Sequence, residues 1–219
     1  ENIVESVKEF IKKLKNKNKE TAPKIPIVPE IVNIEDVKNQ LTGLAKVPIG
    51  ISTRSIEPYT YNFERDIVSI ITASDIDKTA NFVTNLMNEI NLLGNVNITL
   101  VDEVELLRLN PEDFVTRFNR MTRRINENYN KREEKRILYI ILGIGKFLES
   151  LGKDRERFTA NLNGARLAQN CNFIVIDNYT KIKACQFDTW YKKYVTPNTG
   201  IYIGTGFETQ TLWTSNMER

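Results

Sequence analysis

The stretch that decides the fold reads Ile67-Val68-Ser69-Ile70-Ile71-Thr72-Ala73-Ser74-Asp75-Ile76-Asp77-Lys78-Thr79. Its apolar first half is typical of a buried strand, whereas residues 78–93 show apolar side chains at helical spacing up to Gly94. A second strand is predicted for residues 96–101. Strand, helix and strand in this order indicate a βαβ unit with parallel strands.

The turn between the first strand and the helix resembles a phosphate-binding loop. A working loop reads G-x-x-x-x-G-K-[ST], because glycines let backbone N–H groups surround a phosphate while Lys and Ser/Thr hold phosphate and magnesium. Lys78 and Thr79 match this pattern, but Thr72 and Asp77 stand in the glycine positions. A carboxylate there repels a polyphosphate. The candidate nucleotide-binding residues of this degenerate loop are Ser74, Asp77, Lys78 and Thr79.

The same residues have a simpler interpretation as a plain helix start. Asp75 or Asp77 would then be the N-cap, and a carboxylate at this end of a helix is stabilised by the helix dipole. This alternative needs no ligand.

The acid that hydrolysis requires is missing from its expected place. Magnesium-dependent hydrolysis needs an acidic residue at the end of a later apolar strand. The strand at residues 137–142 ends in Leu142 and Gly143. Asp102 and Asp177 end other predicted strands, and either could supply a metal ligand or simply start a loop. We therefore predict no catalytic residue and no metal site.

The rest of the chain continues the alternation of strands and helices, which predicts an α/β fold with a mainly parallel central sheet flanked by helices. A closing β-hairpin is expected from residues 200–204 and 209–213 around Gly206. The other predicted elements are strands at 47–52, 59–63 and 173–176, helices at 111–131 and 155–168, and a helical turn at 190–194.

The first 33 residues differ from the remainder of the chain. Residues 3–17 have the pattern of an amphipathic helix, and residues 18–33 hold prolines at every third position from Pro23 to Pro29, which favours an extended strap. A short helix is predicted for residues 34–41. The expected division is thus a helix and linker at 1–33 and one domain at 34–219, in a fragment of a longer protein. The strap side chains that could dock on a preceding domain, or pack on their own, are Ile25, Ile27, Val28 and Ile31.

Composition excludes several classes of function. Lys and Arg total 31 against 28 Asp and Glu, so the net charge of +3 does not favour a nucleic-acid partner. The chain has no histidine, which excludes Ser-His and Cys-His catalysis. Cys171 and Cys185 lack metal-ligand spacing and are expected to be free thiols in a reducing compartment. The apolar runs are shorter than the ~20 residues of a membrane span.

Several segments together resemble the FtsK/SpoIIIE family of P-loop ATPases. They are the loop at 72–79, the apolar strand at 137–142, and Gly164-Ala165-Arg166-Leu167-Ala168 leading into Phe173-Ile174-Val175-Ile176. The segments at 24–30, 47–51, 57–59 and 200–206 look like parts of the third, C-terminal ATPase domain of type VII secretion proteins of the EssC type. The resemblance implies a RecA-like P-loop NTPase core.

This resemblance also implies a function. Proteins of this kind are membrane-anchored, hexameric motors with tandem ATPase domains, and the terminal domain resembles a docking site for secreted helical-hairpin proteins of the WXG100 kind. The expected role is recruitment of such substrates at the cytoplasmic side of the membrane, beside preceding ATPase domains of the same polypeptide, with no required cofactor. The first alternative is a nucleotide-sensing or residual ATPase domain that binds ATP and Mg²⁺, and the second is a DNA translocase domain.

Overall fold

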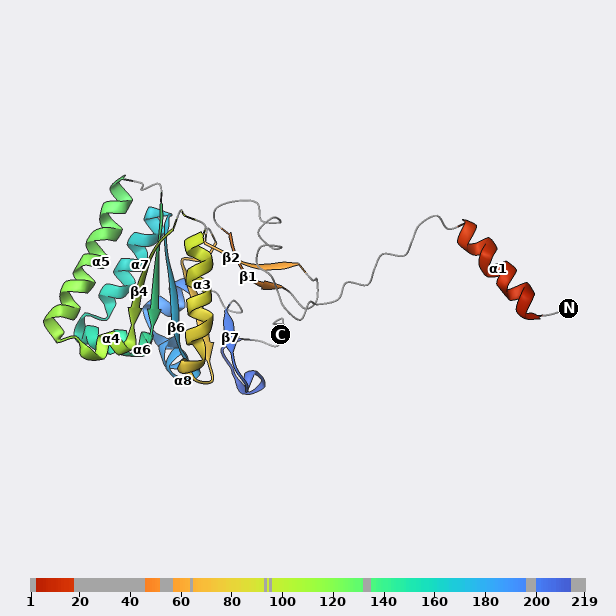
Figure 1. Ribbon diagram of the computed structural model, residues 1–219. Helices are drawn as coiled ribbons and strands as arrows, with labels where there is room; N and C mark the ends of the chain where they lie inside the picture. Colours follow the sequence, from red (N-terminus) through yellow and green to blue (C-terminus); the bar gives the residue numbers. More distant parts are fainter. Residues whose placement is uncertain are drawn as a thin grey trace. The chain divides into compact units, whose positions relative to one another are not determined.

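The computed structural model describes residues 3–17, 46–51, 57–63, 65–92, 94, 96–131, 135–195 and 200–213. The chain divides into two compact units, Glu1–Ile31 and Val32–Arg219 (Figure 1). The strap residues Ile25, Ile27, Val28 and Ile31 and the short helix expected at 34–41 lie outside the described residues.

The first unit contains helix α1 (Ile3–Lys17), as the sequence predicts. Its apolar side chains repeat every three or four residues, so they share one face of the helix. They are exposed by 47–79% and comprise Ile3, Val4, Val7, Phe10 and Ile11.

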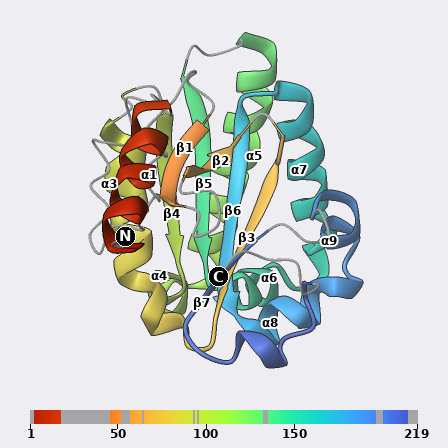
Figure 2. The same cartoon turned by 90° about the vertical axis from the view of Figure 1, so that its right-hand side faces the viewer.

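The second unit is built on a five-stranded sheet in the order β4-β5-β6-β3-β7, in which every pair of neighbours is parallel (Figure 2). A separate antiparallel ribbon is formed by β1 (Lys46–Ile51) and β2 (Pro58–Asn62). The strands of the main sheet are β3 (Val68–Ala73), β4 (Val96–Asp102), β5 (Arg136–Leu142), β6 (Cys171–Asn178) and β7 (Ile201–Ile203).

Helices connect the parallel strands. The longest is α5, and it begins at Pro111 because Asn110 caps it, its Oδ1 accepting from the Asp113 N–H at 2.8 Å. The described α-helices of this unit are α3 (Ala80–Leu92), α4 (Glu103–Arg108), α5 (Pro111–Lys131), α6 (Ile144–Leu151), α7 (Glu156–Ala168), α8 (Tyr179–Ala184) and α9 (Thr189–Tyr194). Short 3-10 turns are η1 (Ile76–Thr79), η2 (Gly152–Asp154), η3 (Cys185–Phe187) and η4 (Phe207–Thr209).

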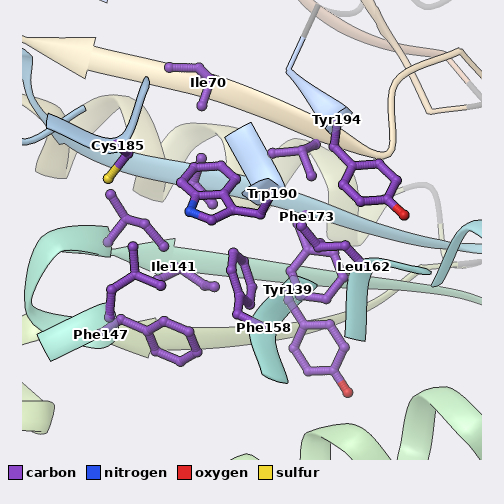
Figure 3. Close-up of a cluster of buried hydrophobic side chains, with 14 of the residues drawn as sticks. Ile70, Tyr139, Ile141, Phe147, Phe158, Leu162, Phe173, Cys185, Trp190 and Tyr194 are labelled. Atoms are coloured by element: carbon purple, nitrogen blue, oxygen red, sulfur yellow. The ribbon is translucent and has the colours of Figure 1, made fainter. Parts of the chain in front are cut away.

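Each face of the sheet carries its own apolar core. One core joins the sheet to α5, α6, α7, α8 and α9, and Trp190, Phe158 and Phe173 meet in it edge to face (Figure 3). The other core joins the opposite face to α3 and the β1–β2 ribbon through Ile90 and Phe63. The sheet is therefore covered on both sides, as its unbroken apolar strands require.

The predicted C-terminal β-hairpin is wrong. β7 pairs with β3, in parallel, with Ile71 opposite Ile201, and the described residues after β7 form the 3-10 turn η4 rather than a strand. β7 lies along the edge of β3, where the backbone N–H and C=O groups of β3 would otherwise have no strand to pair with. Trp213 is buried and lies so close to Gly200 that a Cβ added there would overlap the Trp213 ring.

Candidate functional site

The turn between β3 and α3 is closed by its own hydrogen bonds. Asp75 is the N-cap of η1, as one of the two sequence interpretations predicts, and its Oδ1 accepts from the Asp77 N–H at 3.2 Å. The Asp75 carbonyl accepts from the Lys78 N–H, and the Ile203 carbonyl accepts from the Ser74 N–H, both at 3.2 Å. Three backbone donors that a phosphate would need are therefore already engaged.

The side chains of the turn divide into buried and exposed groups. Thr79 is fully buried, and its hydroxyl donates to the Ile76 carbonyl at 2.6 Å, so it does not face the solvent as a magnesium ligand would. Ser74, Asp77 and Lys78 are exposed, and Lys78 has no ion-pair partner among the described residues. The β7 segment closes over this turn, because a Cβ on Gly204 would lie 2.5 Å from the Ser74 hydroxyl.

Thr72, in the first glycine position, belongs to β3 rather than to the turn. It is fully buried, and its hydroxyl donates to the Asp177 carbonyl at 3.0 Å, which ties β3 to β6. A glycine at this position would lose that buried hydrogen bond.

Glu103 fills the space beside the end of β5, where the hydrolytic acid is expected. Gly143 has φ of 92°, and a Cβ built on it would lie 2.5 Å from the Glu103 Cβ and 2.6 Å from its Oε2. A carboxylate thus lies at this point but comes from α4. Sequence reasoning missed it, although its position directly after the strand-ending Asp102 was a signal.

Two carboxyl groups with raised pKa values, Asp177 and Glu103, lie at this edge of the sheet. Burial raises the pKa of Asp177, although its oxygens accept from the Gly145 and Asn178 N–H groups at 2.8 and 2.7 Å. Burial also raises the pKa of Glu103, and the Asp177 charge adds to the rise while Lys181 opposes it.

The other strand-ending acid, Asp102, starts a helix. It is the N-cap of α4, and its Oδ1 accepts from the Val104 N–H at 2.9 Å, so Asp102 begins a helix rather than the loop that the sequence suggested. In the part of the chain that the structure describes, no three acidic or cysteine side chains gather as a metal site.

A cleft of about 250 Å³ opens between the edge strand β4 and α5. Its floor is apolar, formed by Phe118, Tyr139 and Phe147 among others, and Arg117, Arg120 and Arg124 of α5 lie along it. Three arginines of α5 therefore border an apolar cleft.

The sheet order and the unit at β3 together define the fold class of the chain. A five-stranded parallel sheet with helices on both faces, and a strand–turn–helix unit at β3, is the fold of the P-loop ATPases. Within that class, the structure is similar to the cytoplasmic domain of EssC, with a TM-score of 0.63 and 15% identity, covering 100% of this chain and 49% of that chain.

Two further solved structures have a similar fold. A structure of EssC (ATPases 2 and 3) from Geobacillus thermodenitrificans has a TM-score of 0.58 and 14% identity, covering 100% of this chain and 46% of that chain. The cytoplasmic domain of the Thermomonospora curvata type VII secretion ATPase EccC has a TM-score of 0.58 and 12% identity, covering 86% of this chain and 25% of that chain. No family model and no curated protein matches the sequence. The chain spans about half the length of the EssC chains that it matches.

Proposed function

We propose that this chain is a terminal ATPase-like domain of a type VII secretion motor that binds nucleotide weakly or not at all and recruits secreted helical-hairpin proteins of the WXG100 kind. The observation that carries the proposal is the closed turn at Asp75. A phosphate-binding loop works through free backbone N–H groups, and here those of Ser74, Asp77 and Lys78 already have partners.

The end of β5 supports the same proposal. Gly143 supplies no carboxylate, and the carboxylate in the space beside it is that of Glu103, which comes from α4. Hydrolysis of ATP needs a magnesium ligand near the phosphates and a residue that orients water. The fold is kept without these groups, which is consistent with a function on another surface.

The setting that we propose is that of the structural relatives. EssC and EccC are represented by cytoplasmic domains, and one EssC structure contains ATPases 2 and 3. We place this chain beside preceding ATPase domains of the same polypeptide, in a hexamer at the cytoplasmic face of the membrane, without nucleic acid. Among the described residues, no helix has the length and apolar character of a membrane span.

Calorimetric titration tests the proposal. The chain is titrated with magnesium-ATP and, separately, with a purified WXG100-type protein. We expect no heat from ATP and a micromolar dissociation constant for the protein, about −8 kcal/mol. Asp77→Gly is the reference variant, because it restores one loop glycine while keeping the buried Thr72 hydrogen bond. Absence of binding to any WXG100-type protein would refute recruitment.

The alternative function is nucleotide sensing or residual ATPase activity. It is favoured by Lys78, which is exposed in η1 two residues before α3 and has no ion-pair partner among the described residues. Binding of magnesium-ATP by the unaltered chain, lost in Lys78→Ala, would establish it in place of the first proposal.

A further inference from the structure

Helix α1 (Figure 1) has an apolar face that covers about a third of its circumference. At 3.6 residues per turn, Ile3, Val7 and Phe10 lie within about 60° of one another, and Val4 and Ile11 widen the face to about 120°. The five side chains are exposed by 47–79%. Isolated exposed apolar side chains need no partner, but a contiguous face of them indicates contact with another surface.

The charged side chains of α1 are sorted around this apolar face. Lys8 and Lys13 border it, one on each side, whereas Glu5 and Glu9 lie opposite its middle. All four are exposed. The helix sequence holds five lysines and two glutamates, so its net charge is positive at pH 7. A lysine at the border of an apolar face can lay its methylene groups along that face and keep its ammonium group in a polar layer.

A lipid surface matches this arrangement better than a second helix does. A coiled coil between two copies needs an apolar repeat over three or four heptads with complementary charges beside it. The 15 residues of α1 span only about two heptads, and both borders carry lysine. Helices that lie in the membrane interface combine a lysine-rich polar face with an apolar face that includes aromatic residues.

The length of α1 decides how such a helix would lie. Its 15 residues extend over about 22 Å, which is shorter than the hydrocarbon core of about 30 Å. The helix axis therefore lies in the plane of the interface. In this orientation the apolar face points to the acyl chains, the border lysines reach the level of the lipid phosphates, and the glutamates opposite point to water.

We infer that α1 is an interfacial helix that binds anionic lipid headgroups, with Val7 and Phe10 entering the acyl region and Lys8 and Lys13 contacting lipid phosphates. The inference goes beyond the recruitment of secreted proteins and does not depend on it. One short helix with a few lysines binds reversibly, because each lysine gains only a small attraction to an anionic surface. The helix would thus give the chain a reversible lipid contact.

The test measures co-sedimentation of the whole chain with phosphatidylcholine vesicles that contain either no anionic lipid or about 30% phosphatidylglycerol. The border variant is Lys8→Glu with Lys13→Glu. Its control is Lys135→Glu with Lys153→Glu, which makes the same change in net charge at exposed positions of the second unit. Circular dichroism and the melting temperature confirm that each variant folds.

We expect the unaltered chain to partition at least about tenfold more strongly onto the anionic vesicles, and the border variant to lose at least about tenfold of that binding. The control should stay within about threefold, because its lysines are remote in sequence from the helix. Raising the salt concentration from about 0.05 to about 0.5 M should weaken binding of the unaltered chain severalfold, since screening shortens the reach of the lysine charges.

The apolar face is tested by a second pair of variants. Val7→Ser with Phe10→Ser should lose at least about tenfold of the binding to anionic vesicles. Its control is Leu92→Ser with Leu167→Ser, which removes two apolar side chains of similar exposure from the second unit and should leave binding unchanged.

Insertion is followed directly with Phe10→Trp. Trp190 and Trp213 are buried, so they give a constant background. The added indole should shift its fluorescence emission to shorter wavelength with anionic vesicles and keep the emission of an exposed indole with neutral ones.

The outcomes separate the lipid contact from other partners and from the proposed function. Vesicle binding that survives in both α1 variants, or no binding by the unaltered chain, overturns this inference and leaves recruitment standing, since recruitment is measured without lipid. Self-association in sedimentation that is lost in Val7→Ser with Phe10→Ser would show that a second copy covers the face, and would overturn it. A Phe10→Trp emission already shifted without lipid, in a polypeptide that includes preceding ATPase domains, would show that a protein surface covers the face and would likewise overturn it.

Discussion

Gly143 is the position at which restoring a hydrolytic acid would meet two obstacles. Its φ of 92° strains any residue with a Cβ, and that Cβ would collide with Glu103. We predict that Gly143→Ala lowers the free energy of unfolding by more than the roughly 1–3 kcal/mol of backbone strain alone. Urea unfolding measures the loss.

Gly152→Ala is the matched control, because Gly152 also has a positive φ but nothing lies within 4 Å of an added Cβ. Glu103→Gly removes all three Glu103 atoms that an added Cβ at Gly143 would meet, and should return the cost of Gly143→Ala to that of the control. An equal cost of Gly143→Ala with and without Glu103 would show that strain alone accounts for it.

The Glu103 carboxyl predicts a dependence of stability on pH. Burial and the Asp177 charge raise its pKa in the folded state, so the folded chain holds this proton more tightly than the unfolded chain. Its contribution is fully present below the unfolded pKa and is lost as pH rises through the folded pKa. Glu103→Gln should therefore be more stable than the unaltered chain at pH 7, by less than about 1 kcal/mol, and should lose that advantage at pH 4.

Thermal unfolding at pH 4 and pH 7 checks this prediction. Lys181 lies nearby and favours the charged form, so the net rise reflects burial and Asp177 outweighing that attraction. An advantage of Glu103→Gln that is the same at both pH values would show that it does not come from ionisation.

The site was partly predictable from single residues. An N-cap at Asp75 or Asp77 and the absence of an acid at Gly143 follow from local sequence, because caps and motifs have fixed spacing, and the structure selects Asp75. Glu103 could not be predicted in its place beside Gly143, because that contact depends on β4 lying next to β5. Thr72 likewise has its partner 105 positions away along the chain.

Helices and strands were predictable in proportion to their length and to the signals at their ends. α5 was predicted with its observed bounds, because Asn110 and Pro111 mark its start and its apolar face repeats over 21 residues. The missed helices α4, α6 and α8 have six, eight and six residues, which is too short for a helical period to show.

The error in the hairpin has a different origin. The apolar, glycine-bounded segment around Tyr202 does form a strand, but strand patterns do not specify a partner. β7 pairs with β3 because that edge is open and because Leu212 and Trp213 can then join the core shared with α7 and α9. The two segments are close in sequence, and for this reason a hairpin was predicted. Tertiary packing instead determines that β7 pairs with β3.

The order of strands across the molecule is also absent from local sequence. It places β6 at the centre, between β5 and β3, and makes β4 an edge strand, which is why the cleft beside Leu100 exists and why no sequence pattern revealed it. The fold class was predictable because alternation of strands and helices permits few arrangements.

The two thiols allow a test of whether the second unit unfolds as a single cooperative unit. Cys171 lies in β6 and Cys185 in η3, both in the core shared by α5–α9, and burial raises the pKa of each to about 12. At pH 8 the thiolate fraction of each is then roughly a thousandfold below that of a thiol with the ordinary pKa of 9. Reaction with a thiol reagent therefore requires opening of the core.

We predict that both thiols are modified by iodoacetamide at one common rate, and that urea accelerates both with the dependence of global unfolding. Cys171→Ala and Cys185→Ala assign the two reactions, and free glutathione gives the rate for an exposed thiol. Faster modification of Cys185 alone, with a weaker dependence on urea, would show that the segment from α8 to α9 opens by itself, so that the unit would not unfold as one.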